Sequence, residues 1–193
     1  MKKTIKYLAG SILLASSLGA QAAILDFEGS SVGGGFSSSN LFTRNSLGQN
    51  NGYGHGVVSG SNIAYNGSAL TASLSSLSSF LFNGAYFTGA WNNGLSITVN
   101  GFLGGVATLS KTFVVDSLAP TWQSFDWTVD SLSFSSAGGV NQGYGGSGSH
   151  FAMDNFTYNE VLSSVPEPET YAMFAVGLGL LGAFVRRRKS QAV

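Results

Sequence analysis

The chain has 193 residues, 27 of them glycine, and it is 44% hydrophobic with no cysteine, which excludes disulfides and thiolate metal sites. Its formal charge of zero hides an uneven distribution, because seven of the nine basic residues lie near the two ends, whereas between positions 23 and 165 seven acidic residues outnumber two basic ones for a net charge of −5. This balance excludes the basic surface that nucleic-acid binding needs, so we expect no nucleic-acid partner and favour cations or neutral glycans as ligands.

Residues 1–22 have the pattern of a signal peptide. Three lysines precede an apolar segment from Tyr7 to Leu18, and Ala20 and Ala22 match the small-x-small rule for cleavage. We therefore expect signal peptidase to cut after Ala22 and the protein to be exported. The alternative is an uncleaved anchor helix, for which the apolar segment is short.

Residues 23–160 are predicted to form an all-β domain. Apolar residues recur mainly at every second position in short runs, which is the pattern of half-buried strands. The strands are expected at 24–28, 56–65, 79–87, 95–99, 106–116, 125–129, 131–135 and 150–158. Short strands at this spacing favour a jelly-roll-like β-sandwich. A β-helix is the structural alternative, although the chain shows no fixed repeat.

Asn-Gly pairs predict the tight turns between these strands. They occur at 51–52, 66–67, 83–84, 93–94 and 100–101, and glycine supplies the positive φ that tight hairpins require. Two segments rich in glycine and serine, 29–40 and 137–149, are expected to be long surface loops.

Three carboxylates form a candidate metal site. If 24–28 is a strand, its alternation turns Phe27 inward and places Asp26 and Glu28 on the opposite face. The apolar phase of the last strand slips at Asp154-Asn155, which indicates a bulge there. Because first and last strands of a sandwich often pair, Asp26, Glu28 and Asp154 could share a structural calcium ion. The alternative is three solvated carboxylates, with Asp154 making turn hydrogen bonds.

This layout of acidic residues on the first and last strands resembles that of jelly-roll carbohydrate-binding modules. The resemblance implies a structural calcium ion and a glycan ligand. Tyr53, Trp91 and Tyr144, in turns and glycine-rich segments, are the candidates for stacking on sugar rings. Alternatively these rings cap the core. Trp122 and Trp127 have opposite strand phases, and Trp127 is the expected core residue.

The sequence contains no motif for catalysis. A nucleophile elbow, a zinc-protease motif and a phosphate-binding loop are all absent. Glycosidase pairs such as Asp126 with Asp130, or Asp26 with Glu28, remain an alternative that spacing alone does not support. We therefore expect a protein without enzymatic activity.

The C-terminus has three consecutive parts. After a linker at 161–165, Pro166, Glu167 and Pro168 precede an uncharged apolar segment at 171–185 and the basic cluster Arg186, Arg187, Arg188 and Lys189. A helix over 171–185 would reach roughly 22 Å, short of a hydrocarbon core of about 30 Å. We expect a short transmembrane helix whose basic cluster stays in the cytoplasm. The alternative is a permanent anchor.

This order of motif, short helix and basic cluster at 166–190 resembles the PEP-CTERM sorting tail of exopolysaccharide-producing Gram-negative bacteria. The resemblance implies cleavage by an exosortase near Pro166-Glu167-Pro168. Delivery would then follow, through an intermediate tethered to the inner membrane, to the cell surface or the extracellular matrix. The combined prediction is a non-catalytic β-sandwich that associates with exopolysaccharide in a biofilm. A structural or adhesive protein acting through protein contacts, and a secreted hydrolase, are the alternatives.

Overall fold

The computed structural model describes residues 23–159. Ala20 and Ala22 of the predicted signal peptide, Pro166, Glu167 and Pro168, the segment 171–185 and the basic cluster at 186–189 all lie outside the described residues. The elements, in chain order, are β1 (Ala23–Leu25), β2 (Ser37–Ser39), β3 (Leu41–Asn45), α1 (Gly52–His55), β4 (Asn62–Asn66), a 3-10 turn (Gly67–Ala69), β5 (Ala72–Gly89), β6 (Asn92–Asn93), β7 (Leu95–Leu103), β8 (Val106–Val115), β9 (Thr121–Ala137), β10 (Val140–Asn141) and β11 (Phe151–Tyr158).

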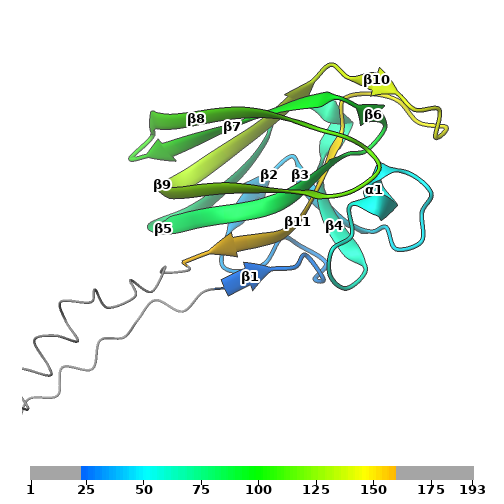
Figure 1. The fold of residues 1–193 in the computed structure, drawn as a ribbon. Coiled ribbons are helices and arrows are strands. Elements are labelled where there is room, and N and C mark those ends of the chain that lie inside the picture. Colours follow the sequence, from blue (N-terminus) through cyan, green and yellow to red (C-terminus); the bar gives the residue numbers. More distant parts are fainter. Residues whose placement is uncertain (1–22, 160–193) are drawn as a thin grey trace, which may run out of the picture. The chain divides into compact units, whose positions relative to one another are not determined.

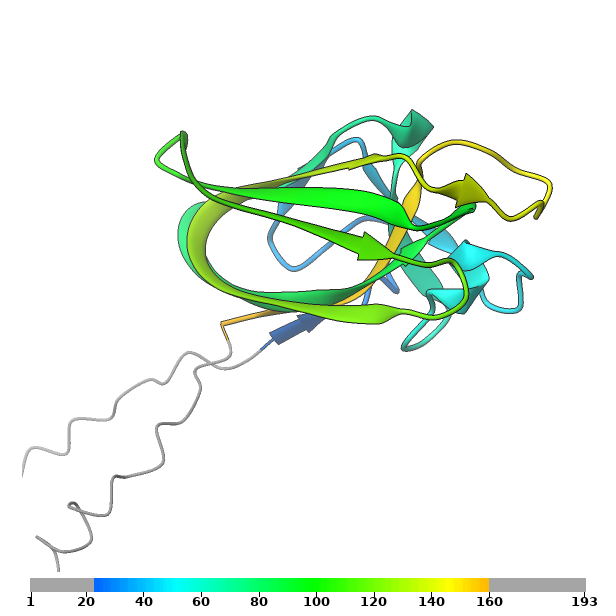
Figure 2. The same ribbon diagram turned by 45° about the horizontal axis from the view of Figure 1, so that its top comes forward.

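Most of these strands belong to one antiparallel sheet that folds over into two layers (Figure 1). The strand order is β3-β4-β11-β5-β9-β7-β8, with β1 paired to β11 and β2 to β5. Residues 80–87 of β5 pair with 121–129 of β9 beside β11, whereas residues 72–75 pair with 131–134 of β9 beside β7. Both long strands therefore bend from one layer into the other, as Figure 2 shows. The predicted all-β sandwich is confirmed.

The core lies between the two layers and is rich in phenylalanine. Strand alternation turns Leu95, Ile97 and Val99 of β7 inward, where each is fully buried. Phe82 of β5 stacks on Phe156 of β11 with ring centroids 4.5 Å apart. Each buried ring contributes about 1.5–3 kcal/mol through removal of apolar surface from water. Since the chain has no disulfide, this burial is the main source of stability.

Several strand and turn predictions differ from the structure. The Asn-Gly pairs at 83–84 and 100–101 lie inside β5 and β7, because long-range pairing on both sides of these strands overrides the local turn preference. The predicted strands at 125–129 and 131–135 are one strand, β9. The predicted strand 56–65 begins only at Asn62, since α1 and a loop precede it. The bulge predicted at Asp154-Asn155 is confirmed by a register shift and by a φ of 49° at Asn155.

A second, small apolar cluster lies on the outer face of the β3-β4-β11-β5 layer. The short helix α1 begins at Asn51, whose side chain accepts hydrogen bonds from the N–H groups of Tyr53 and Gly54. It packs Tyr53 against Ile63, Ala90 and Ala152. This segment therefore covers part of a sheet face that would otherwise face solvent.

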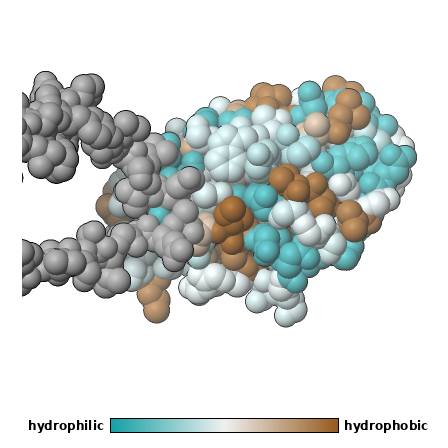
Figure 3. Space-filling view, turned by 60° about the horizontal axis from the view of Figure 1, so that its bottom comes forward, coloured by the Kyte–Doolittle hydropathy of each residue, from teal (hydrophilic) through white to brown (hydrophobic). Residues whose placement is uncertain are grey.

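The surface shown in Figure 3 carries separate apolar patches among polar residues rather than one continuous apolar field. Within residues 23–159, no helix is long and apolar enough to cross a membrane.

Candidate functional site

Asp26 and Glu28 do not lie on a strand, because β1 ends at Leu25 and Phe27 has a φ of 60°. The Oδ1 of Asp26 accepts a hydrogen bond from the backbone N–H of Glu28 at 3.2 Å. The Oε1 of Glu28 accepts from the N–H groups of Ser61 and Asn62 at 2.8 and 2.6 Å. These backbone donors, that of Asn62 first, hold the pKa of Glu28 below its usual value. Glu28 therefore fixes the loop before β4.

Asp154 lies on β11 and is completely buried (0% exposed). Its Oδ2 accepts from the backbone N–H groups of Val58 and Ser59 at 2.7 and 3.0 Å, and its Oδ1 accepts from the N–H of Asn155 at 2.7 Å. Burial raises the pKa of Asp154, and the three N–H donors oppose this effect. The carboxylate thus anchors the loop 57–60 onto the outer face of the sheet.

The structure does not gather the three carboxylates predicted to bind calcium. The strand that precedes Asp26 and Glu28 does meet the strand that carries Asp154, because β1 pairs with β11 from Ala23 and Tyr158 to Leu25 and Phe156. However, Asp26, Glu28 and Asp154 each accept backbone hydrogen bonds, and within residues 23–159 no three His, Asp or Glu side chains form a group that could hold a metal ion. The described fold therefore offers no preformed calcium site.

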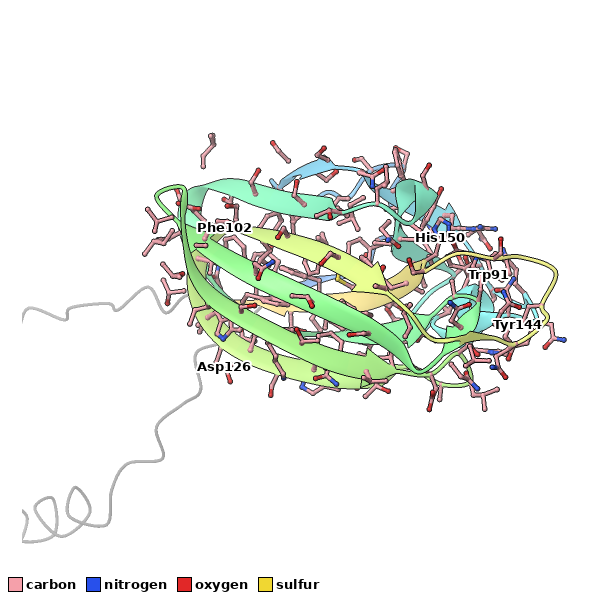
Figure 4. All side chains as sticks on the ribbon, turned by 90° about the horizontal axis from the view of Figure 1, so that it is seen from above. Trp91, Phe102, Asp126, Tyr144 and His150 are labelled. Carbon is pink, nitrogen blue, oxygen red and sulfur yellow. The ribbon has the colours of Figure 1, made fainter. Side chains whose placement is uncertain are left out.

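The three aromatic residues predicted to bind glycans lie at one end of the sandwich. Tyr53 meets Trp91 edge to face with centroids 5.2 Å apart, and His55 of the same helix meets Tyr144 at 5.9 Å. Figure 4 shows Trp91 and Tyr144 at this end together with His150. The prediction for Tyr53 needs correction, because this side chain is only 3% exposed and cannot offer a ring face to a ligand. Burial raises the pKa of Tyr53 to about 12.

Trp91 is partly covered by the loop that follows β10. A Cβ atom at Gly146 would lie 2.4 Å from Cζ2 of Trp91, so the loop backbone lies directly on the indole ring. Asn141 holds the loop in place by donating from its Nδ2 to the carbonyl oxygen of Gly146 at 2.8 Å. Tyr144 is half-buried, and its hydroxyl lies 3.4 Å from the Oγ of Ser117. In this arrangement the two rings close the end of the sandwich.

The two histidines are held by the backbone. The Nδ1 atom of His55 lies 2.8 Å from the carbonyl oxygen of Ser117, and that of His150 lies 2.8 Å from the carbonyl oxygen of Asn66. Asp126, one of the carboxylates considered for glycoside hydrolysis, accepts a hydrogen bond from Asn83 at 3.1 Å. These contacts give all three side chains a structural role.

Trp122, which is exposed, and Tyr86, which is half-buried, form an aromatic pair that the sequence analysis did not propose as a binding site. They are direct neighbours on β9 and β5, with centroids 5.1 Å apart, and Trp122 is 40% exposed. A Cβ atom at Gly84 would lie 2.5 Å from Cζ2 of Trp122, so an edge of the indole lies against the backbone at this glycine. We call Tyr86, Trp122 and Gly84 the aromatic platform. The outward strand phase of Trp122 was the signal that could have found it.

The aromatic platform has one closed and one open side. Tyr86 pairs with Asp154 across β5 and β11. The carboxylate of Asp154 accepts hydrogen bonds from the N–H groups of Val58 and Ser59, so the loop 57–60 borders the platform. On the other side, no further strand among residues 23–159 pairs with 121–129 of β9, since β7 pairs with 131–137. The exposed indole of Trp122 can stack on the apolar face of a ring.

A polar hollow of about 250 Å³ lies elsewhere, beside β3. It is lined by Ser30, Ser31, Val32, Ser38, Asn40, Leu41, Phe42 and Thr43. Ligand pockets typically measure about 300–1,000 Å³, so this hollow admits only a small group.

Comparison with known proteins identifies the C-terminus. Residues 164–189 match the PEP-CTERM protein-sorting motif. No curated protein matches the chain. Among solved structures, the chain is similar to TmCBM61 in complex with β-1,4-galactotriose, at 11% identity and a TM-score of 0.45 over 69% of this chain and 93% of that one. It is also similar to the family 32 carbohydrate-binding module of C. perfringens NanJ in complex with galactose, at 13% identity and a TM-score of 0.41 over 71% of this chain and 99% of that one. The chain is thus an exported protein that carries a PEP-CTERM protein-sorting motif at residues 164–189.

Proposed function

We propose that this protein is a non-catalytic surface or matrix protein whose β-sandwich binds a neutral polysaccharide of its own cell envelope. The observation that carries the proposal is the aromatic platform, in which Trp122 contacts Gly84 and Tyr86 with 40% of its surface open to solvent. One face of a sugar ring consists of C–H groups and is apolar, whereas its hydroxyls lie at the edge. An exposed indole matches the apolar face of such a ligand.

The charge of the domain favours a neutral ligand over an anionic one. Between positions 23 and 165 the net charge is −5, and the two cations there are already engaged. Arg44 lies over the ring of Tyr53 at 4.7 Å, and the Nζ of Lys111 donates to the carbonyl oxygen of Ser124 at 2.9 Å. An anionic polysaccharide would meet net repulsion at low salt.

The sorting motif supports the proposed route. Signal peptidase would remove residues 1–22, and an exosortase would cut near Pro166-Glu167-Pro168 after the basic cluster has halted export at the inner membrane. Mass spectrometry of the protein isolated from its own cells tests this route. Recovery of residues 186–189 in the mature protein would contradict processing.

Glycan binding is tested with the protein purified from its producing cells. Affinity electrophoresis through gels that contain the cell's own exopolysaccharide should retard the wild type and leave Trp122→Ala unretarded. Leu118→Ala is the matched control, because Leu118 is 66% exposed and lies outside the platform. Equal retardation of Trp122→Ala and Leu118→Ala would refute the platform as the binding surface.

A further inference from the structure

The turn between β7 and β8 exposes an apolar tip at one end of the sandwich. Leu103, Val106 and Leu109 are 43%, 65% and 39% exposed, and no residue from Asn100 to Ser110 is charged. Gly104 and Gly105, both with positive φ, form the turn, and a Cβ at either would meet nothing within 4 Å. We call residues 102–109 the apolar tip. Large aliphatic side chains rarely gather at the end of an exposed hairpin without a partner.

The apolar tip lies at the end of the domain where the chain leaves the described fold. Phe102 pairs with Ser131, which pairs with Ser75 just before the bend of β5, and the side chain of Leu77 in that bend is fully exposed. Asn159, the last described residue, donates from its N–H to the carbonyl oxygen of Leu81 at 2.7 Å. Figure 4 shows Phe102 at the end opposite Trp91 and Tyr144, and Figure 1 shows the outer ends of β1 and β11 on the side of this tip.

We propose that the apolar tip contacts the lipid surface of the membrane while the C-terminal tail is still attached. The inference rests on the sorting route of the proposed function, but not on glycan binding. Eleven residues, 160–170, separate Asn159 from the apolar segment at 171–185. They span at most about 40 Å, so an inserted tail keeps the exit end of the domain close to the bilayer. At that short range a weak apolar contact is sufficient, because the tether supplies a high effective concentration.

The chemistry of the tip favours lipid over the other possible occupants. Its branched aliphatic side chains have no hydrogen-bonding groups with which to recognise a sugar. Asp130 accepts a hydrogen bond from the N–H of Gly104, and this contact fixes the turn in a defined shape. An apolar wedge of a few residues inserts into the headgroup region without needing the larger area that a stable dimer requires.

The absence of cysteine allows a direct test on the full chain. Leu103→Cys and Val106→Cys are labelled with an environment-sensitive dye, and Val140→Cys, 71% exposed on β10 near the opposite end, is the control. Each full-length variant is reconstituted into liposomes of phosphatidylethanolamine and phosphatidylglycerol, with and without nitroxide-labelled lipid. We expect the dyes at 103 and 106 to be quenched at least about twofold more than the dye at 140.

Three outcomes would overturn the proposal. The first is equal quenching at all three positions. The second is a chain that does not float with the liposomes. The third is a blue shift at 103 that depends on protein concentration and is insensitive to nitroxide lipid, which indicates a second copy as the occupant. Retardation in exopolysaccharide gels is measured in parallel on the same variants, so loss of glycan binding with quenching intact refutes only the proposed function.

Discussion

Replacing Gly84 by alanine tests the aromatic platform without removing an aromatic ring. The added Cβ would lie 2.5 Å from the carbonyl oxygen of Gln123, 2.5 Å from Cζ2 of Trp122 and 2.8 Å from Cη2 of the same ring. Carbon atoms in contact are normally about 3.5–4.0 Å apart, so the indole or the strand has to move by about 1 Å. We expect the ring to move away from the backbone at this position.

The expected magnitude follows from two opposed effects. Overpacking of this kind costs about 1–3 kcal/mol of folding free energy. Replacing glycine restricts the unfolded chain and returns about 0.4–1 kcal/mol. The free energy of unfolding, measured by urea denaturation, should therefore fall by up to about 2.6 kcal/mol. Affinity for exopolysaccharide should fall at least about tenfold, which corresponds to about 1.4 kcal/mol.

A double-mutant cycle separates the ring from the strand. If the clash with the indole dominates, Trp122→Ala should relieve part of the cost of Gly84→Ala, and the two changes should be non-additive by about 0.5 kcal/mol or more. Unchanged stability, unchanged tryptophan fluorescence and unchanged gel retardation in Gly84→Ala would refute the view that Trp122 lies on the backbone at this position.

Further predictions concern the contacts around the platform and the opposite loop. Asp154→Ala should destabilise the fold by about 2–4 kcal/mol in urea denaturation, because the N–H groups that its carboxylate satisfies lose their acceptor. Because the pKa of Glu28 is lowered in the folded protein, Glu28 stabilises the fold above its usual pKa of about 4.3, and this stability is lost as the pH falls through the lowered value. Between pH 5 and 3 the Glu28→Gln variant should therefore lose less free energy of unfolding than the wild type. An equal loss in both proteins would contradict this. Adding calcium to the metal-free protein should leave the melting temperature unchanged, and a rise would show a site that the described residues do not form. Gly146→Ala should change tryptophan fluorescence by displacing the loop from Trp91 while preserving glycan retardation, and loss of retardation would move the binding surface to that end.

The sequence was sufficient to predict individual strands, but it was less informative about which strands pair with each other. The clean alternation of Leu95 to Val99 was sufficient to predict β7, and the phase slip at Asp154 was sufficient to predict a bulge. The turn predicted from the Asn-Gly pair at 83–84 was wrong. The turn propensity of this pair competes with pairing to strands on both sides, which a local pattern does not reveal. The prediction that Asp26 and Glu28 lie on a strand was wrong for a similar reason. Phe27 has a positive φ, and the path of the chain after β1 is not visible in the local alternation of residues.

The candidate site illustrates the same limit. Tyr53, Trp91 and Tyr144 were chosen because they lie in turns and glycine-rich segments, yet Tyr53 is buried in the small apolar cluster and the backbone at Gly146 lies against Trp91. Gly84 has the opposite consequence, because on an open sheet face the missing side chain leaves room for the edge of an exposed indole. Whether a glycine beside an aromatic residue buries or displays the ring depends on which layer covers that face, and only the fold determines this.

The bend in β5 and β9 relates the two proposed surfaces to each other. Trp122 lies near the start of β9, and the strand changes layer only at Asp130, close to the apolar tip. Eight residues separate these positions, and a fully extended chain of that length spans at most about 26 Å. A domain that rests on the membrane through its tip would therefore hold the aromatic platform well above the lipid headgroups. Glycan binding and membrane contact can then occur at the same time, so quenching of a dye at Leu103→Cys should persist when exopolysaccharide is added. Loss of that quenching on glycan addition would mean that the two surfaces compete, which a separation of this size does not allow.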